Sequence, residues 1–148
     1  LVLVGKKSKH FDPQQLADSL GVGDLLEFRA WVDFRELPYE IDRGDVCFFT
    51  PPADREEIHN TIATKIYQYM ARGKPTIVGS ARYMKEFVES SEIGLAVDEK
   101  NPESFAEAVL KLYRDPKLYK RYSENARKKI ESLYWDETVR KLVAFYDQ

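Results

Sequence analysis

The chain contains very little cysteine and histidine, and this scarcity argues against several kinds of protein. Among its 148 residues there is one cysteine, Cys47, and there are two histidines, His10 and His59. One cysteine cannot build a disulfide framework, and neither histidine has a metal-type spacing to a second ligand. Cys47 lies in an apolar segment, where a small core residue is a better interpretation than a nucleophile. We therefore expect neither a disulfide scaffold nor a metal site.

Long hydrophobic runs and a strong charge of one sign are also absent. No apolar run approaches the roughly 18 residues of a membrane span, and no signal peptide is evident. The formal net charge is −2, so no basic field would attract nucleic acid or an anionic membrane. Hydrophobic residues make up 43% of the chain and aromatic residues 13%, which is too much for a disordered chain. The length predicts one globular domain over residues 1–148.

Short apolar runs alternate with segments of helical pattern. The predicted strands are 1–5, 25–30, 45–50, 76–79 and 94–97. The predicted helices are 13–20, 36–43, 61–72, 81–90, 103–114, 117–132 and 136–147. This alternation predicts an α/β fold, a three-layer Rossmann-like domain with a mostly parallel sheet of about five strands. Residues 117–148 would form a C-terminal helical extension, because no strand separates the last two helices.

Three loops follow the carboxyl ends of predicted strands, where ligands bind in sheets of this kind. The first, residues 6–10, is basic and suits a phosphate, although a solvated lysine run is an equally good interpretation. In the second, Trp31 is either a ligand contact or a core tryptophan at a strand end. The third, residues 51–60, is long and polar and leads into helix 61–72. Long loops at this edge are usually functional.

Helix 61–72 carries a polar stripe that suits an anion. At about 100° per residue, the stripe includes Thr61, Thr64, Lys65 and Gln68, next to an apolar face that would pack on the sheet. Hydroxyls and a lysine therefore gather in the first two turns, where free N–H groups and the helix dipole favour negative charge. The pattern predicts a phosphate site. The competing interpretation is an ordinary amphipathic helix with a solvated polar side.

The same region resembles a known enzyme family. The segments Asp45–Pro51, His59–Lys65 and Gln68–Pro75 are similar to the nucleotide-sugar-binding half of GT-B glycosyltransferases. Within that superfamily they are most similar to family 4, the group 1 type, whose members retain the anomeric configuration. Other segments resemble the family in the same order, namely 1–5, 21–32, 91–97, 125–135 and 142–146.

The resemblance implies a donor site made by the middle motif and the loop after the second strand. The implied substrate-binding residues are Trp31, Val32, His59, Asn60, Thr61, Ile62, Ala63, Thr64, Lys65 and Gln68. The loop at Trp31 would lie along the base, and Lys65 would neutralise the diphosphate as a point charge. His59 would lie beside the donor sugar. No catalytic residue is identified.

Two positions depart from the family pattern. Many members carry a Glu-x7-Glu pattern, with the first acid near the donor sugar and the second on the ribose hydroxyls. The corresponding residues here are Asn60 and Gln68. Gln68 can still bond a ribose hydroxyl through its amide, whereas Asn60 brings no charge to the sugar.

The resemblance implies that the chain is the donor-binding domain of a retaining glycosyltransferase. The parent enzyme would transfer a sugar from a nucleoside-diphosphate sugar, of the UDP or GDP type, to an acceptor hydroxyl. The nucleotide sugar is the substrate, and no cofactor or metal is expected. An N-terminal domain absent from this chain would hold the acceptor glycan or lipid, so the isolated chain would be inactive. The parent enzyme would be cytoplasmic, with the inner face of the membrane as a further location, and no nucleic acid is an expected partner.

Two other functions stay open. The first is a flavodoxin-like or receiver-like regulatory module, although Gly5-Lys6 and Thr50-Pro51 stand where a receiver needs acidic residues. The second is a non-catalytic interaction domain that kept the fold and lost the ligand, which Asn60 and Gln68 would allow.

The family also predicts an unusual sheet. A strand that would precede Leu1 lies centrally in family members, between the counterparts of 1–5 and 45–50. Two strand edges left unpaired inside the protein cost about 1–3 kcal/mol for each unmet backbone group. Direct pairing of 1–5 with 45–50 is therefore expected, in the order 25–30, 1–5, 45–50, 76–79, 94–97. The alternative is a strand borrowed from a second copy of the chain.

Overall fold

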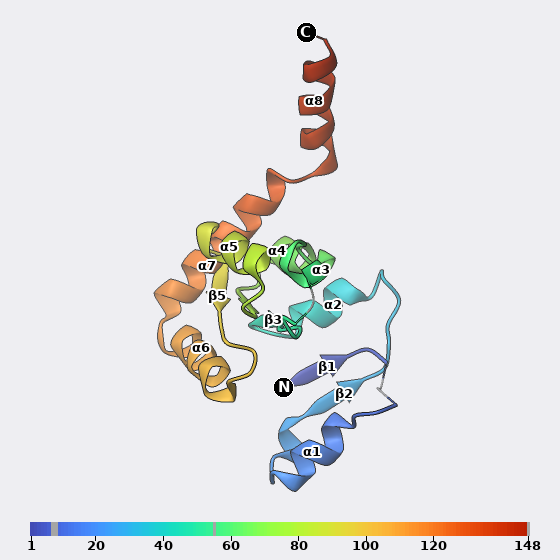
Figure 1. Ribbon diagram of the computed structural model, residues 1–148, viewed down its shortest axis with the longest axis vertical. Coiled ribbons are helices and arrows are strands. Elements are labelled where there is room, and N and C mark those ends of the chain that lie inside the picture. Colours follow the sequence, from blue (N-terminus) through green and yellow to red (C-terminus); the bar gives the residue numbers. More distant parts are fainter. Residues whose placement is uncertain (7–8, 55, 148) are drawn as a thin grey trace. The chain divides into compact units, whose positions relative to one another are not determined.

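A computed structural model of the chain describes residues 1–6, 9–54 and 56–147. Lys7 and Ser8 of the predicted loop 6–10, and Arg55 of loop 51–60, lie outside the described residues. The chain divides into two compact units, Leu1–Gly44 and Asp45–Gln148 (Figure 1). The single domain expected over residues 1–148 stays a prediction.

The first unit is built on two parallel strands. Its elements are β1 (Val2–Val4), α1 (Pro13–Ser19), a 3-10 turn (Gly23–Leu25), β2 (Glu27–Arg29) and α2 (Leu37–Asp42). β1 and β2 pair in parallel, and the N–H of Gly5 extends the ladder by donating to the Arg29 carbonyl at 3.0 Å. Arg29 also holds α2, because its guanidinium pairs with the Glu40 carboxylate at 2.8 Å. Because β1 and β2 are parallel, their carboxyl ends lie at the same edge of this sheet.

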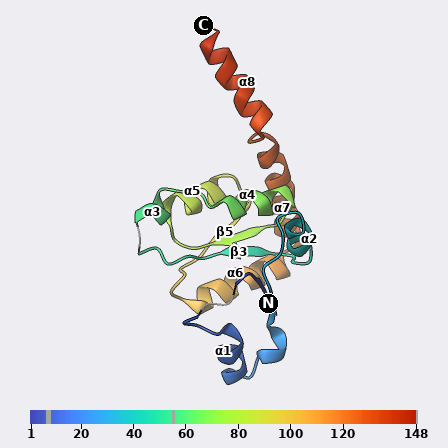
Figure 2. The ribbon, with the colours of Figure 1, turned by 90° about the vertical axis from the view of Figure 1, so that its right-hand side faces the viewer.

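The second unit has three layers. Its strands are β3 (Cys47–Phe49), β4 (Thr76–Val78) and β5 (Gly94–Ala96), in the parallel order β3-β4-β5. Its helices are α3 (Glu56–His59), α4 (Thr64–Ala71), α5 (Arg82–Ser90), α6 (Pro102–Arg114), α7 (Pro116–Glu131) and α8 (Trp135–Tyr146). Helices α4 and α5 cover one face of the sheet and α6 covers the other (Figure 2).

Successive strand residues point into two hydrophobic clusters, one on each face of this sheet. Val78 of β4 belongs to the cluster that contains Ile66 of α4, whereas its neighbour Ile77 belongs to the cluster that contains Leu112 of α6. Helix α7 contributes residues to both clusters. Full burial of one such side chain contributes about 1.5–3 kcal/mol, so these clusters fix the helices on the sheet.

The α/β class with parallel strands is confirmed, and each predicted strand forms. The predicted single order of five strands is wrong, because the described strands make two sheets, β1-β2 and β3-β4-β5. Each strand pairs inside its own compact unit. A direct ladder between segments 1–5 and 45–50 would have required one fixed register across both units. A strand supplied by a second copy stays a prediction.

The helix predicted over 61–72 is wrong in its first turn. Helix α4 starts at Thr64, after Ala63 in an extended conformation with φ −62° and ψ 136°. The preceding residues form the separate short helix α3, which was not predicted. Thr61 and Ile62 occupy the break, and β-branched side chains of this kind lower helix propensity. The Thr61 hydroxyl therefore lies ahead of α4 rather than on its polar stripe.

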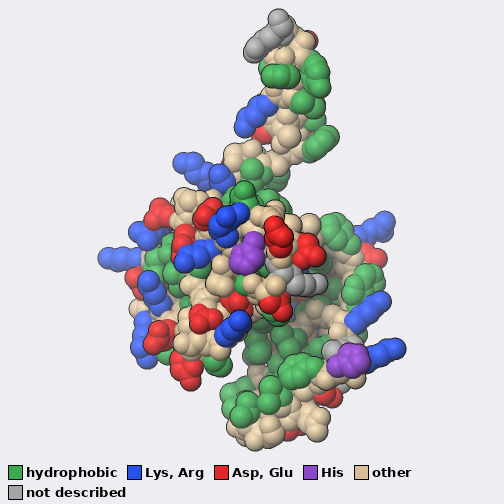
Figure 3. All heavy atoms as spheres, in the orientation of Figure 1, with side chains coloured by type: hydrophobic (Ala, Val, Ile, Leu, Met, Phe, Trp, Pro, Cys, Tyr) green, Lys and Arg blue, Asp and Glu red, His purple; other side chains and the backbone are tan. Residues whose placement is uncertain are grey.

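The other predicted helices are confirmed to within one residue at each end. Asn101 caps α6 by accepting the N–H groups of Glu103 and Ser104 at 3.0 and 3.3 Å, with Pro102 in the first helical position. None of the described helices is long and apolar enough to cross a bilayer. Helix α8 buries none of its described side chains, and its apolar side chains are visible on the surface in Figure 3.

The close approach of Gly94 to β4 predicts a strong effect of any side chain at this position. A Cβ there would lie 1.8 Å from the backbone oxygen of Thr76, so β5 would have to separate from the buried β4. We expect Gly94→Ala to lower the free energy of unfolding by about 2–3 kcal/mol, measured by urea denaturation. In the comparison variant Gly21→Ala the new Cβ meets nothing within 4 Å. The free energy of unfolding of that variant should fall only by the cost of its positive φ, about 1 kcal/mol. Equal decreases in the two variants would contradict the packing argument.

Candidate functional site

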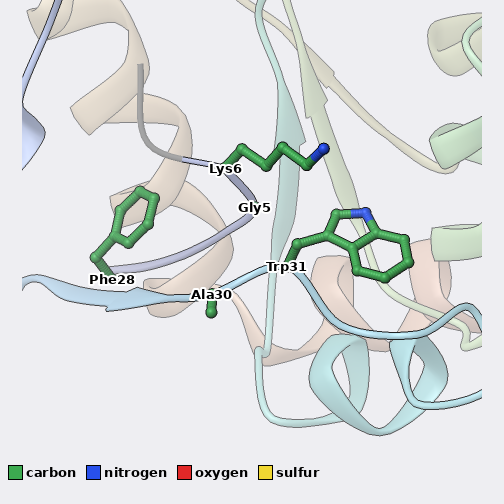
Figure 4. Close-up of a pocket in the computed structure, with 5 residues that line it drawn as sticks. All are labelled: Gly5, Lys6, Phe28, Ala30 and Trp31. Carbon is green, nitrogen blue, oxygen red and sulfur yellow. The ribbon is translucent and has the colours of Figure 1, made fainter. Parts of the chain in front are cut away.

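The carboxyl ends of β1 and β2 border a hollow of about 500 Å³. It is lined by Gly5, Lys6, Phe28, Ala30 and Trp31 (Figure 4). Figure 4 shows the Lys6 side chain and the Trp31 ring extending to the same side of the strand ends, with Phe28 on the other side. Gly5 has a φ of +152°, which residues with a Cβ rarely adopt, so glycine permits the turn directly after β1.

Trp31 is a surface residue. The residue is 64% exposed, so the interpretation as a core tryptophan at a strand end is wrong. An exposed indole presents a flat apolar face and one N–H donor, which suits stacking against a planar ring. The next residue, Val32, is half-buried in a stretch without regular structure. Its backbone groups, rather than its side chain, are therefore suited to polar contacts.

In the second unit, the start of helix α4 lies at the carboxyl end of β3. The ammonium of Lys65 is 4.2 Å from the centroid of the Phe49 ring, the last residue of β3. This distance is within the range of a cation–π contact. Thr64 and Lys65 are exposed, and among the described residues no side chain caps the helix. Open backbone N–H groups beside a lysine make a surface suited to phosphate.

The neighbouring predicted residues divide into exposed and packed groups. Gln68 is half-buried one helical turn after Thr64, on the same face of α4. Ile62 and Ala63 are half-buried and pack against the hydrophobic cluster of Val78, so their backbone groups are the parts suited to a polar ligand. Thr61 is exposed in the link before the helix.

His59 ends helix α3, and both of its ring nitrogens are hydrogen-bonded within the protein. Nε2 lies 3.0 Å from the Ala53 carbonyl oxygen, and Nδ1 accepts the backbone N–H of Arg82 at 3.2 Å. The Arg82 guanidinium donates to Asn60 Oδ1 at 3.4 Å. Together with Glu56, the residues His59, Asn60 and Arg82 line a second hollow of about 270 Å³.

Glu99 follows β5 and joins two neighbouring turns. Its Oε1 accepts the N–H of Ala53 at 3.3 Å, and its Oε2 accepts the N–H of Ser80 at 2.9 Å. Partial burial by itself would raise the pKa of Glu99, but backbone hydrogen bonds led by that of Ser80 outweigh it and lower the pKa to about 2. Among the residues that the structure describes, no three His, Cys, Asp or Glu side chains gather closely enough to hold a metal ion.

Sequence reasoning missed three residues of this edge, Ser80, Arg82 and Glu99, and named Ala53 only as part of loop 51–60. A signal for two of them was present. Ser80 and Glu99 come shortly after the fourth and fifth predicted strands, and the rule that ligand sites lie at carboxyl ends applies to those strands as well. The predicted site included only the loops after the first three predicted strands.

A comparison with known families identifies the chain. The family model described as glycosyl transferases group 1 matches residues 1–129. The chain belongs to the group 1 glycosyl transferases. The match includes the residues of both hollows and the start of α4. It sets aside the flavodoxin-like or receiver-like interpretation.

A curated relative of this group 1 chain is the D-inositol 3-phosphate glycosyltransferase of Thermomonospora curvata. The two are 26% identical over 133 residues, a match that covers 90% of this chain and 30% of the relative. The chain thus spans less than a third of the length of that relative. Its matched part includes residues of both compact units.

Solved structures agree with the group 1 assignment at the level of the fold. HepE of Anabaena, solved in complex with UDP, superposes with a TM-score of 0.81 at 18% identity, over 98% of this chain and 39% of that one. Sucrose-phosphate synthase from Thermosynechococcus elongatus superposes with a TM-score of 0.76 at 20% identity, over 99% of this chain and 37% of that one. The group 1 chain therefore has the Rossmann-like fold of GT-B glycosyltransferases.

The low pKa of Glu99 predicts how the stability of this glycosyl transferase chain changes in acid. The folded-state pKa of about 2 lies below the ordinary value of 4.5. The ionised carboxylate therefore stabilises the fold above about pH 4.5, and this contribution is lost as the pH falls from 4.5 towards 2. We expect Glu99→Gln to unfold at lower urea than the wild type at pH 7, and the difference to shrink at pH 3.

The exposed Glu107 on α6 supplies the control for this measurement, because Glu107→Gln also removes one carboxylate. The urea midpoint of that variant should differ from the wild type equally at both pH values. A difference for Glu99→Gln that is the same at pH 7 and pH 3 would contradict the assignment of the low pKa.

Proposed function

We propose that this chain binds a nucleoside-diphosphate sugar, of the UDP or GDP type, as the donor half of a retaining glycosyltransferase. The observation that carries the proposal is the start of α4, where open backbone N–H groups lie beside the exposed Lys65. Membership of group 1 supplies the reaction class, transfer of a sugar. The acceptor, a glycan or a lipid, would be held by another part of the parent enzyme. The cytoplasm is its proposed compartment.

The diphosphate is the part of the donor that gains negative charge during transfer. As the bond between the sugar and the diphosphate breaks, charge grows on the departing phosphate oxygen. The N–H groups of Thr64 and Lys65, the Thr64 hydroxyl and the Lys65 ammonium are donors suited to that charge. The contact of Lys65 with Phe49 holds the ammonium over the end of β3 before any ligand arrives. Donors that are already in place stabilise the leaving group without a reorganisation cost.

The nucleoside end of the donor needs a flat surface and a hydroxyl partner. We assign the base to the exposed face of Trp31, with the backbone of Val32 as its polar partner. We assign the ribose hydroxyls to the side-chain amide of Gln68, which can both donate and accept hydrogen bonds. Support for a nucleotide comes from the HepE structure, which was solved with UDP and has the same fold.

The sugar end is assigned to the hollow at the end of α3. Asn60 lines this hollow, and residues 61–63 connect it along the chain to the start of α4. Asn60 already accepts a hydrogen bond from Arg82, and its amide nitrogen can donate to a sugar hydroxyl. His59 shapes the hollow, with both ring nitrogens used inside the protein. A neutral Asn60 binds a sugar hydroxyl by hydrogen bonding alone, where an acid would add charge.

A non-catalytic binding domain is the second candidate function. The observation that favours it is the replacement of the family's two acids by Asn60 and Gln68. The two candidates differ in the fate of the donor, because a transferase breaks the bond between sugar and diphosphate. A parent enzyme that binds the nucleotide sugar and leaves it intact in the presence of acceptors would favour the second candidate.

The phosphate assignment predicts the effect of removing Lys65. A charge-assisted hydrogen bond to phosphate contributes about 1.5–3 kcal/mol, so Lys65→Ala should weaken binding of the nucleotide diphosphate roughly tenfold or more. The measurement is calorimetric titration with UDP, GDP and ADP. Lys85 is an exposed lysine on α5, and Lys85→Ala should keep the wild-type affinity. Unchanged affinity in Lys65→Ala, with the fold intact by circular dichroism, would defeat the phosphate assignment.

The proposal also predicts what the 148 residues do on their own. Binding a donor does not position an acceptor hydroxyl, and that positioning supplies much of the rate of a two-substrate reaction. We expect slow hydrolysis of the donor at most, and no sugar transfer, from the purified chain. The assay is release of the nucleoside diphosphate with and without added acceptors. Robust turnover on any acceptor would mean that a complete catalytic site lies within these residues.

A further inference from the structure

The backbone of Ala53 is held by two side chains, one of them far away in sequence. Its N–H donates to Glu99 Oε1 at 3.3 Å, a contact across 46 residues. Its carbonyl oxygen lies 3.0 Å from His59 Nε2. Ala53 has no polar side chain, so these contacts act on the course of the main chain in the loop after β3.

The second contact of His59 fixes which ring nitrogen carries the proton. A carbonyl oxygen can only accept, so Nε2 must donate to Ala53. A backbone N–H can only donate, so Nδ1 must accept from Arg82 at 3.2 Å. Both bonds are made together only by the neutral ring with its proton on Nε2. His59 thereby connects the loop after β3 to the first residue of α5.

Glu99 extends the same connection to the turn after β4. Its Oε2 accepts the N–H of Ser80 at 2.9 Å. Gly79 permits this approach, because a Cβ there would lie 3.1 Å from Oε2 and 3.5 Å from the Thr50 Cα. One chain of hydrogen bonds therefore runs from Ser80 through Glu99, Ala53 and His59 to α5.

The segment held in this way leads into the proposed phosphate site. Its described residues, 50–54 and 56–60, begin directly after Phe49, on which Lys65 rests, and end shortly before Ile62 and Ala63, which pack against the core. Both ends are thus fixed by packing. Its middle is fixed by the two contacts at Ala53 and the bond from His59 to α5.

We propose that Glu99 and His59 are positioning residues that act through the backbone of Ala53: together they set the course of the main chain over residues 50–54 and 56–60, and so its entry into the start of α4. Neither needs to touch the nucleotide sugar. The relevance to binding rests on the proposed function, whereas the coupling between Glu99, Ala53, His59 and α5 is a property of the protein without ligand.

Amide hydrogen exchange in the ligand-free 148-residue chain tests the coupling. In Glu99→Ala we expect about tenfold faster exchange at Ala53 and Ser80, and a smaller increase, roughly threefold, at Arg82, which Glu99 does not contact. In His59→Ala we expect faster exchange at the Arg82 and Ala53 amides and an unchanged exchange rate at the Ser80 amide. Glu99→Gln keeps one acceptor oxygen and should give intermediate rates, which protects the test if the alanine variant unfolds. Glu107→Ala on α6 is the matched control and should change none of these amides.

An Arg82 amide that exchanges at the wild-type rate in both Glu99 variants would overturn the coupling. The second arm is titration with UDP. If the coupling serves binding, Glu99→Ala and His59→Ala should each weaken UDP about tenfold, and the double variant should be little weaker than either. Changed amide exchange with unchanged UDP affinity would overturn the role in binding. A wild-type chain that binds none of UDP, GDP and ADP would instead contradict the proposed function, and the exchange rates would still decide the coupling.

Discussion

The parallel ladder β3-β4-β5 is the constraint on which the second unit depends. Parallel strands end at one common edge, so residues that follow β3, β4 and β5 meet there although they are far apart in sequence. The buried β4 holds this arrangement, and the missing side chain of Gly94 lets β5 approach the Thr76 backbone. The turn at Ser80, the loop at Ala53 and the carboxylate of Glu99 are close only because the ladder brings their strands together.

The polar groups at this edge divide into those used within the protein and those left open to a ligand. Glu99 and His59 form their hydrogen bonds with backbone groups, and these bonds hold the loop between β3 and α4. Thr64 and Lys65 remain exposed at the uncapped start of α4. A frame of internally bonded groups beside open donors is the arrangement that the proposed stabilisation of a leaving diphosphate requires. In the first unit, Trp31 presents an exposed indole ring.

Local features of the fold were predictable from the sequence, whereas features that depend on distant contacts were not. Apolar runs located the strands, and Asn101-Pro102 located a helix start, because each signal lies within a few residues. The role of Glu99 depends on partners 46 and 19 residues away, which no local pattern reveals. The break before Thr64 and the division into two sheets likewise depend on tertiary contacts. Residue type also could not decide whether Trp31 lay in the core or on the surface.

Mapping of a bound nucleotide by nuclear magnetic resonance decides whether the start of α4 binds the diphosphate. Titration of the isotope-labelled chain with UDP, GDP and ADP reports a contact at each backbone amide and at the Trp31 indole N–H. We expect the largest shift changes at the Thr64 and Lys65 amides, at the uncapped start of α4, together with a change at the Trp31 indole. Saturable changes confined to other surfaces, or no change with any of the three nucleotides, would contradict the phosphate assignment.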